Sequence, residues 1–190
     1  MEFWVSKVVK TLPRMHPNVI TVMGLVPPVL FYYFLSTGHL GWALVSYCGV
    51  VLDLIDGIYA RATNQTSAFG AFLDSTLDRL SDVIFIAAFA AGGVISWPIA
   101  VAAIAVSFVI SYARSRGELL LPAGTLVYQG PIERAERLGI LFFAILSYIL
   151  FPTVRLGIYS ISEILIILLV ALSLLTIIRR ILFVHKNVEK

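Results

Sequence analysis

Six apolar segments make up most of this 190-residue sequence and constrain its fold more than any other feature. They run over residues 19–37, 41–60, 67–92, 97–113, 138–151 and 160–178. Most approach the roughly 20 residues that a membrane-spanning helix requires. Only 13% of the residues are charged, whereas soluble domains carry about 25%. The sequence therefore predicts an all-α integral membrane protein of one domain over residues 1–190, with a six-helix transmembrane bundle over 19–180.

Three details refine this bundle. The fifth segment is short for a membrane span unless its helix begins in the polar stretch before residue 138. Pro27 and Pro28 are expected to kink the first span. Residues 1–15 combine apolar and basic side chains, which predicts a short interfacial helix that Pro13 and Pro17 terminate.

The distribution of Lys and Arg predicts the orientation in the membrane. Basic residues are concentrated in the N-terminal arm, the C-terminal tail and the loops 61–66 and 114–137, whereas the opposite loops hold only Arg155. By the positive-inside rule, both termini are expected in the cytoplasm, in a multi-pass protein of the cell membrane. The net charge of +3 is modest, and without a basic stripe that has interleaved aromatics it does not indicate nucleic-acid binding. The single cysteine excludes an internal disulfide.

All five aspartates lie between residues 53 and 82, inside otherwise apolar segments. A charged carboxylate near mid-membrane costs a few kcal/mol, so such residues usually mark a functional site. Asp53 and Asp56 are three residues apart, and Asp74 and Asp78 are four apart, so each pair projects from one helix face. Because clustered carboxylates cannot all stay ionised without a cation, the pattern predicts a site for a hard divalent ion.

The residues around the aspartates are suited to a diphosphate. Gly57 and Gly70 leave space beside the backbone for a headgroup or a partner helix. Arg61 is placed to bind phosphate oxygens bidentately. Ser67 or Thr66 is expected to cap the third helix. The alternative reading of the same spacing is a transporter or ion channel with an intramembrane aspartate cluster.

The pattern Asp-x-x-Asp-Gly-x-x-Ala-Arg-x8-Gly-x-x-x-Asp-x-x-x-Asp resembles the signature of the CDP-alcohol phosphatidyltransferase family. Every fixed position is matched, by Asp53, Asp56, Gly57, Ala60, Arg61, Gly70, Asp74 and Asp78. Six helices with cytoplasmic termini also agree with that family, so the resemblance covers nearly the whole chain. It favours an enzyme over a transporter, which would leave Gly57 and Arg61 without a role.

The resemblance implies a role for each matched residue. Asp53, Asp56, Asp74 and Asp78 would bind two Mg²⁺ or Mn²⁺ ions, and Asp78 would also act as the general base. The acceptor hydroxyl would attack the β-phosphate of a CDP-linked lipid and expel CMP, on the cytoplasmic side. The residues at the family's CDP-lipid-binding positions are Pro17, Asn18, Val19, Thr21, Gly57, Arg61 and Ser67. Asp82 is expected to support the site indirectly.

Two blocks, residues 111–118 and 130–138, carry the information on the acceptor. Their arginines suggest an acceptor that itself bears a phosphate. The Glu-Arg-x-Glu-Arg-Leu run at 133–138 resembles the branch that makes phosphatidylinositol phosphate or archaetidylinositol phosphate from inositol 1-phosphate. Arg116, Arg134 and Arg137 are the predicted acceptor-phosphate contacts, and Glu133 and Glu136 are candidates to orient them or to bond inositol hydroxyls.

Three questions stay open at this point. Glycerol 3-phosphate also carries a phosphate and is the main rival acceptor, whereas serine fits the arginine blocks less well. The donor lipid has either acyl chains or isoprenoid ethers. The family resemblance implies a homodimer, which the small residues Ala87, Ala88, Ala90, Ala91 and Gly92 would permit, although they would equally serve packing within one chain.

Overall fold

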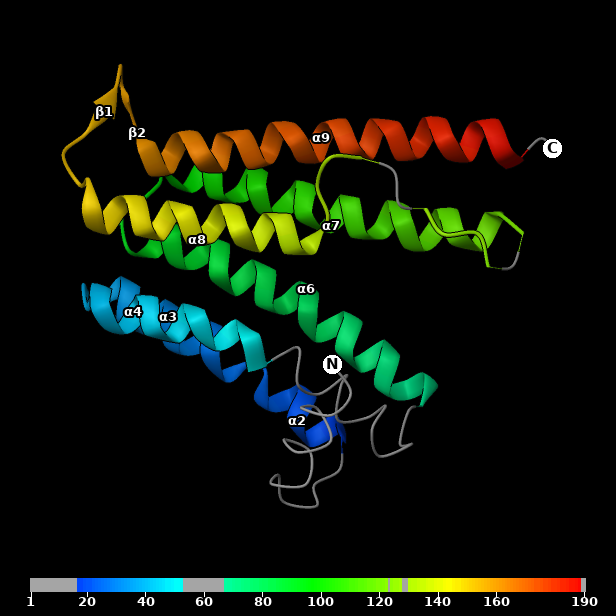
Figure 1. Cartoon of the computed structure of the whole chain (residues 1–190), viewed down its shortest axis with the longest axis horizontal. Coiled ribbons are helices and arrows are strands. Elements are labelled where there is room, and N and C mark those ends of the chain that lie inside the picture. The colour runs from blue at the N-terminus through cyan, green and yellow to red at the C-terminus, as the bar shows by residue number, and fades with distance from the viewer. Residues whose placement is uncertain (1–16, 53–66, 123, 128–129, 189–190) are drawn as a thin grey trace, which may run out of the picture. The chain divides into compact units, whose positions relative to one another are not determined.

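The computed structural model describes residues 17–52, 67–122, 124–127 and 130–188 (Figure 1). The predicted interfacial helix at 1–15 and the residues Asp53, Asp56, Gly57 and Arg61 lie outside this part of the chain. The chain forms two compact units, Met1–Ala88 and Phe89–Lys190, and each is described by itself. The expectation of a single membrane domain stays a prediction.

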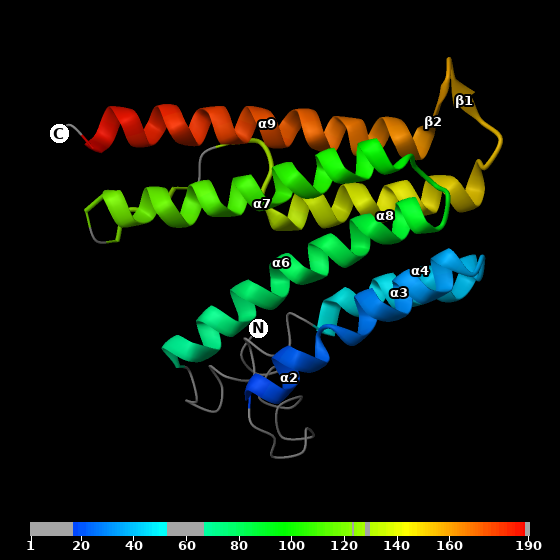
Figure 2. The same cartoon turned by 180° about the vertical axis from the view of Figure 1, so that it is seen from behind.

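The first unit contains short helices and most of one long helix. They are α2 (Pro17–Met23), α3 (Val26–Ser36), α4 (Leu40–Cys48), the 3-10 turn η1 (Gly49–Leu52) and α6 (Ala68–Ala91), whose last turn belongs to the second unit. Helices α3 and α4 lie side by side as an antiparallel pair, as both views show (Figures 1 and 2). The expected second span at 41–60 is thus described only as far as residue 52, by α4 and η1.

The distortion expected from Pro27 and Pro28 takes the form of a break in the first span rather than a kink within one helix. The helical path is interrupted before them, at Gly24 and Leu25, and α3 then begins at Val26. Both prolines therefore lie in the first turn of α3. The reason is local, because a proline lacks the N–H that a first-turn residue does not need and its fixed φ suits a helix start.

An aromatic cluster forms the core of the first unit. Phe31 of α3 is fully buried and lies edge-on to Tyr47 of α4, with ring centroids 5.3 Å apart. Phe85 of α6 completes the cluster, with centroids 5.4 Å from Phe31 and 4.8 Å from Tyr47. Such pairs contribute about 0.5–1.5 kcal/mol beyond the area they bury. This cluster therefore joins α6, which carries the described aspartates, to α3 and α4.

The second unit is built from three long helices and one small hairpin. They are α7 (Trp97–Leu120), α8 (Arg134–Leu150), β1 (Arg155–Leu156), β2 (Tyr159–Ser160) and α9 (Ile161–Val188). Helix α9 packs against both α7 and α8. Helices α7 and α9 run in the same direction and α8 runs in the opposite one (Figure 1). The start of α8 therefore lies beside the middle of α7 and α9, whose C-terminal ends extend beyond it (Figure 1).

Two helix boundaries differ from the sequence-based expectation. Helix α7 continues to Leu120 rather than ending near residue 113, and α9 continues to Val188 rather than ending near 178. Arg114, Arg116 and Arg180, expected in a loop and a tail, are therefore helical. Arginine is a good helix former, and no proline occurs until Pro122, so charge alone does not end these helices. Helix α8 does begin in the polar stretch before residue 138, which confirms the extension required of the fifth helix.

The segment between α8 and α9, expected as a plain loop, contains a two-residue antiparallel ladder. Arg155 pairs with Ser160 and Leu156 pairs with Tyr159. The connection is Gly157-Ile158, and Gly157 has φ of 67°, a conformation that a two-residue hairpin turn favours and glycine adopts without strain. The turn was missed because its only strong sequence signal is this one glycine.

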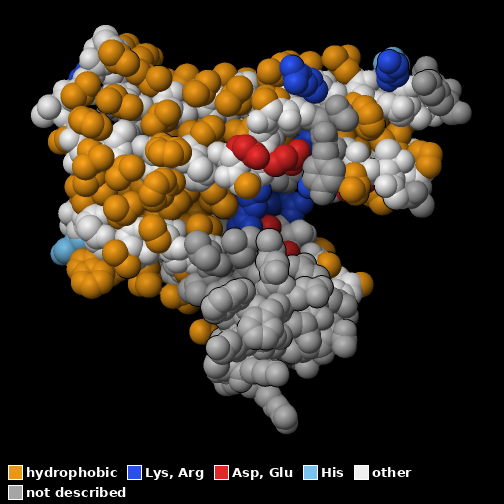
Figure 3. Space-filling model, in the orientation of Figure 1, with side chains coloured by type: hydrophobic (Ala, Val, Ile, Leu, Met, Phe, Trp, Pro, Cys, Tyr) orange, Lys and Arg blue, Asp and Glu red, His pale blue; other side chains and the backbone are white. Residues whose placement is uncertain are grey.

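The exterior of the described helices is strongly apolar. Hydrophobic side chains cover much of the face shown in Figure 3, and charged side chains gather in few places. Trp42, Phe72, Val101 and Phe143 are each about 60% exposed, as expected for side chains that face lipid. Within the described residues, three helical stretches are long and apolar enough to cross a membrane, at Asn18–Ser36, Trp97–Leu120 and Ile161–Val188. The count of six spans stays a prediction.

Candidate functional site

Helix α6 carries three of the five aspartates on successive turns of one face. Asp74 and Asp78 are half-buried, and Asp82, one turn further on, is only 4% exposed. Two carboxylates one turn apart suit a hard divalent ion but are fewer than such an ion requires. Within the described ranges no group of three potential ligands forms. The other two predicted ligands, Asp53 and Asp56, lie outside those ranges.

Ser67 fixes the beginning of α6. Its Oγ accepts a hydrogen bond from the Gly70 N–H at 2.9 Å, and the helix begins at the next residue, Ala68. This is the expected N-cap geometry, in which a side-chain oxygen satisfies an N–H of the first turn. Of the two candidate caps, Ser67 and Thr66, the structure shows Ser67 in this role. Because the cap fixes where the helix starts, it also fixes the register of Asp74 and Asp78.

Gly70 is the point where α2 approaches α6. A Cβ atom at this position would lie 3.1 Å from Ser67 Oγ and 3.4 Å from Asn18 Oδ1. The structure therefore brings together Asn18 and Ser67, two of the predicted CDP-lipid contacts, around a residue without a side chain. Pro17 is the first residue of α2. Two further predicted contacts differ in exposure, since Thr21 is 6% exposed and Val19 is 48% exposed. The last two, Gly57 and Arg61, lie outside the described residues.

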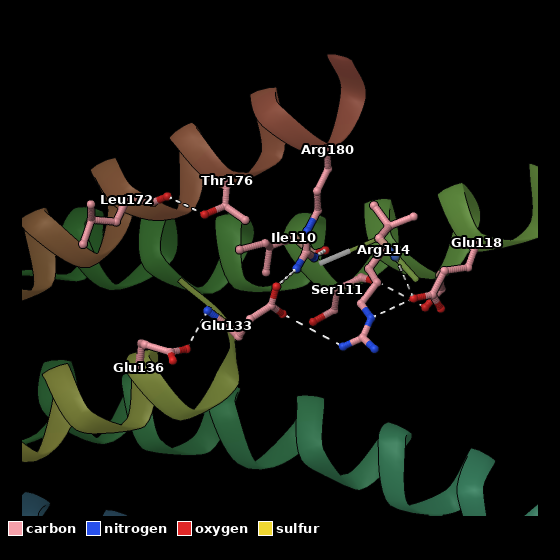
Figure 4. Close-up of polar contacts among 11 residues, drawn as sticks. Ile110, Ser111, Arg114, Glu118, Glu133, Glu136, Leu172, Thr176 and Arg180 are labelled. Atoms are coloured by element: carbon pink, nitrogen blue, oxygen red, sulfur yellow. Dashed lines mark hydrogen bonds and ion pairs between the residues drawn. The ribbon is translucent and has the colours of Figure 1, made fainter. Parts of the chain in front are cut away.

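A cluster of arginines and glutamates joins α7, α8 and α9 in the second unit (Figure 4). Arg180 of α9 is 1% exposed, and its guanidinium donates hydrogen bonds to the Ile110 carbonyl oxygen at 2.5 Å and to Glu133 Oε1. Arg114 Nη1 lies 4.0 Å from Glu133 Oε2, and Arg114 Nε donates to Glu118 Oε1 at 3.0 Å. The four charges of these side chains balance.

The predicted acceptor arginines lie beside this cluster, at the start of α8 and on α7. Arg134 is the first residue of α8 and is half-buried, and Arg137, one turn on, is 5% exposed. Arg116 is exposed on α7. A buried arginine in a membrane protein is costly and usually functional. Since the N-terminus of a helix also carries a partial positive charge, the first turn of α8 favours an anionic ligand.

Sequence reasoning missed the residues that support this turn. Arg180 was expected in the C-terminal tail and Arg114 in a loop, whereas both contact Glu133 from within helices. One signal was available for Arg180: Ser173, Thr176 and Arg180 recur at helical spacing in an otherwise apolar segment, and all three are buried. Polar residues at that spacing indicate a buried face rather than a solvated tail.

Comparisons with known proteins agree with the site. The family model for CDP-alcohol phosphatidyltransferase matches residues 14–178. An archaetidylinositol phosphate synthase from Pyrococcus horikoshii is 36% identical over 174 residues, which cover 91% of this chain and 85% of that protein. A phosphatidylinositol phosphate synthase from Corynebacterium glutamicum is 31% identical over 184 residues, covering 92% of this chain and 80% of that protein.

A solved structure is similar over almost the whole chain. The crystal structure of Mycobacterium tuberculosis phosphatidylinositol phosphate synthase with CDP-DAG bound superimposes with a TM-score of 0.78 at 27% identity, covering 95% of this chain and 92% of that one. A second structure of that protein, in complex with manganese and citrate, also has a TM-score of 0.78 and 27% identity, covering 95% of this chain and 88% of that one. The helical membrane fold expected from the sequence is therefore supported.

Proposed function

Because this chain belongs to the CDP-alcohol phosphatidyltransferase family, we propose that it transfers the phosphatidyl or archaetidyl group of a CDP-linked lipid to inositol 1-phosphate, with release of CMP. It is a membrane enzyme that transfers substituted phosphate groups. The family establishes the class of reaction, and the identity of the acceptor is what we propose. The observation that carries it is the arginine-rich first turn of α8, in a chain whose relatives are inositol phosphate lipid synthases.

The proposed reaction exchanges one phosphate ester bond for another. An acceptor hydroxyl oxygen bonds to the β-phosphorus of the CDP-lipid, and the bond from that phosphorus to the bridging oxygen breaks, so that CMP leaves with the electron pair. Asp78 takes the hydroxyl proton as the oxygen attacks. Asp74, one turn earlier on the same face of α6, and Asp78 are the described members of the proposed ligand set.

Asp53, Asp56, Asp74 and Asp78 would hold two divalent ions, Mg²⁺ or Mn²⁺, which when bound neutralise the diphosphate charge. The donor set fits such ions chemically, because hard carboxylate oxygens are their preferred ligands. The manganese in a relative's crystal structure supports this assignment. On the donor side, Asn18 and Ser67 would contact the CDP group beside Gly70, together with Pro17, Val19, Thr21, Gly57 and Arg61.

The proposed acceptor contacts are Arg116, Arg134 and Arg137. Their guanidinium groups match phosphate oxygens in geometry and charge. Arg137 has the most restricted environment, since it is 5% exposed, whereas Arg116 is exposed. We therefore assign the larger share of acceptor binding to the two α8 arginines.

We further propose six transmembrane helices, with the active site and both termini facing the cytoplasm. In the second unit, the basic residues lie in the C-terminal halves of α7 and α9 and in the first turn of α8, away from the hairpin that contains Arg155 (Figure 1). This asymmetry is the pattern of the positive-inside rule. A homodimer is also proposed from the family. Ala88 and Ala90 are already buried within the chain, which leaves Ala87, Ala91 and Gly92 as candidates for that contact.

The test is CMP release by the purified protein with Mg²⁺ and either a diacyl or an isoprenoid-ether CDP-lipid. Inositol 1-phosphate, glycerol 3-phosphate, free inositol and serine are compared as acceptors. Turnover with inositol 1-phosphate alone is expected. Turnover with glycerol 3-phosphate instead would retain the chemistry and overturn the acceptor. No CMP from any acceptor would overturn the reaction itself and return the aspartates to a transport role.

A further inference from the structure

We propose that the hairpin between α8 and α9, residues 151–160, is a lateral anchor that binds the surface of the lipid bilayer. In this anchor, Leu156 and Ile158 insert into the interfacial layer and Arg155 contacts lipid phosphates. This role lies beyond the proposed reaction, because the hairpin follows the end of α8, away from the first turn of that helix (Figure 1). It is the same whichever side of the membrane the hairpin faces.

The hairpin projects sideways from the ends of the helices. In both views β1 and β2 extend away from the axis of α9 at its start, rather than continuing along that axis (Figures 1 and 2). Transmembrane helices tilt only about 20° on average from the direction that crosses the membrane. A segment that leaves the end of such a helix sideways therefore runs along the membrane surface.

The hairpin lies at the boundary between hydrocarbon and lipid headgroups. From Ile161 to Arg179, α9 rises about 27 Å, which is close to the roughly 30 Å of hydrocarbon in a bilayer. With the charged Arg179 at one boundary, the start of α9 lies at the other. Trp97, the first residue of α7, is exposed at the same end of the unit, and Tyr159 is exposed in β2. Exposed Trp and Tyr at helix ends are typical of this boundary.

The antiparallel ladder separates apolar side chains from polar ones. Leu156 pairs with Tyr159, so their side chains project from one face, and Arg155 pairs with Ser160 on the other. Ile158 lies in the turn and is 76% exposed, and Leu156 is 65% exposed. A turn that faced water would favour polar or small residues at these positions. The exposed apolar face is instead suited to the interfacial layer of a bilayer.

Hydrogen bonds fix the base of the hairpin. The Ser160 N–H donates to Glu163 Oε2 at 2.9 Å, and the Glu163 N–H donates to Ser160 Oγ at 3.2 Å, which is a capping box at the start of α9. Ser147 Oγ lies 3.0 Å from Ser162 Oγ and ties the end of α8 to the start of α9. The exposed side chains are thus held in a defined direction, which lowers the entropy lost when they bind lipid.

Arg155 provides a positive charge for lipid phosphates. Its side chain is exposed, and among the described residues no carboxylate forms an ion pair with its guanidinium. A guanidinium matches phosphate oxygens in geometry, and its apolar stem can lie along lipid while the charge reaches the headgroups. Every phospholipid carries this phosphate, so the contact does not require a lipid with net negative charge.

The depth of the hairpin is measured with a fluorophore on Ile158→Cys, in a Cys48→Ser background that removes the other thiol. In phosphatidylcholine vesicles, a nitroxide near the headgroup end of the lipid chain should quench this label at least about twofold more than a nitroxide near the chain end. The control is Leu168→Cys, exposed about 10 Å further along α9, which should show the reverse order. The same reverse order at position 158 would overturn the interfacial placement.

Acrylamide, a neutral quencher dissolved in water, distinguishes the other possible surroundings of the hairpin. It should quench the label at position 158 only weakly. Strong quenching by acrylamide with none by the nitroxide lipids would place the hairpin in water. Protection from both kinds of quencher would assign this surface to a second copy of the chain. Either of these two results would overturn the anchor.

The phosphate contact is tested with Arg155→Gln and Arg155→Lys in the same labelled protein. Arg155→Gln should increase acrylamide quenching of the label about twofold in phosphatidylcholine vesicles, whereas Arg155→Lys keeps the charge and should change it less. In vesicles of a neutral galactolipid, which has no phosphate, the two variants and the parent should be equal. No change in phosphatidylcholine, or an equal change in both lipids, would overturn the contact between Arg155 and phosphate.

Discussion

Ser67 Oγ lies 2.9 Å from the Gly70 nitrogen and accepts its hydrogen bond, so that α6 begins one residue later. This bond sets the register of the helix that presents Asp74 and Asp78. The donor side of the proposed site thus depends on a capping hydrogen bond, which is lost when the Ser67 hydroxyl oxygen is removed.

Ser67→Ala should lower the free energy of unfolding by about 1 kcal/mol, because a first-turn N–H loses its partner. It should also raise the donor KM, since Ser67 is a proposed CDP contact. Ser67→Thr keeps a hydroxyl and should retain the cap. Ser75→Ala, also on α6, removes a hydroxyl that bonds only the carbonyl of Phe72 and serves as a control. Thermal unfolding in detergent measures the first effect, and an unchanged midpoint for Ser67→Ala would contradict it.

Gly70→Ala should raise the donor KM on the order of tenfold, because the new Cβ displaces Ser67 and Asn18 by a few tenths of an ångström. The matched control is Gly41→Ala on α4, where an added Cβ meets nothing within 4 Å. CMP release measured over a range of CDP-lipid concentrations checks both variants. Equal donor KM values for the two would show that the space at Gly70 is not needed for binding.

Asp78→Asn should lower kcat by at least about a hundredfold, because the amide cannot take the acceptor proton. CDP-lipid binding should remain measurable. Asp82→Asn, one turn further along α6 and buried, should reduce turnover without abolishing it. Single-turnover CMP release with a parallel binding assay distinguishes the two roles, and full turnover by Asp78→Asn would remove Asp78 as the base.

Arg134→Ala and Arg137→Ala should each raise the acceptor KM about ten- to a hundredfold, because each removes a charge-assisted bond to phosphate. The donor KM should change much less. Arg155→Ala in the hairpin is the control, since it removes the same side chain beyond the opposite end of α8. Equal increases in both KM values would assign the α8 arginines to folding or topology.

Chelation of divalent ions should reduce CMP release to background, because the diphosphate charge is then not neutralised. Addition of Mg²⁺ or Mn²⁺ should restore the activity. Calcium should restore less activity than Mg²⁺, since its coordination is larger and less strictly octahedral. Turnover that persists in excess chelator would contradict the metal assignment for the aspartates.

The parts of the structure that sequence could predict are those set by neighbouring residues. The start of α6 directly after Ser67 follows from local capping chemistry, and the start of α8 in its polar stretch follows from span length. The placement of Asp74 and Asp78 on one helix face likewise depends only on residues within α6, so it could be predicted from their spacing. The roles of these residues rest on the family motif and are tested by the variants above.

The parts that sequence could not predict depend on contacts between distant segments. Arg180 meets Ile110 across 70 residues and Glu133 across 47, and no local pattern specifies those partners. The same holds for Gly130 against Thr176. The extended ends of α7 and α9 were missed for a different reason, since their arginines indicate a cytoplasmic loop when only charge is considered.

The contact between Arg180 and Glu133 also has a consequence for how the protein is made. Helix α9 follows α8 in the chain, so the ribosome releases Glu133 and the first turn of α8 before Arg180 exists. A nascent chain that has inserted α8 already contains every aspartate but lacks the arginine that bonds Glu133. The contact that joins α9 to the start of α8 can therefore form only after the last helix has been made.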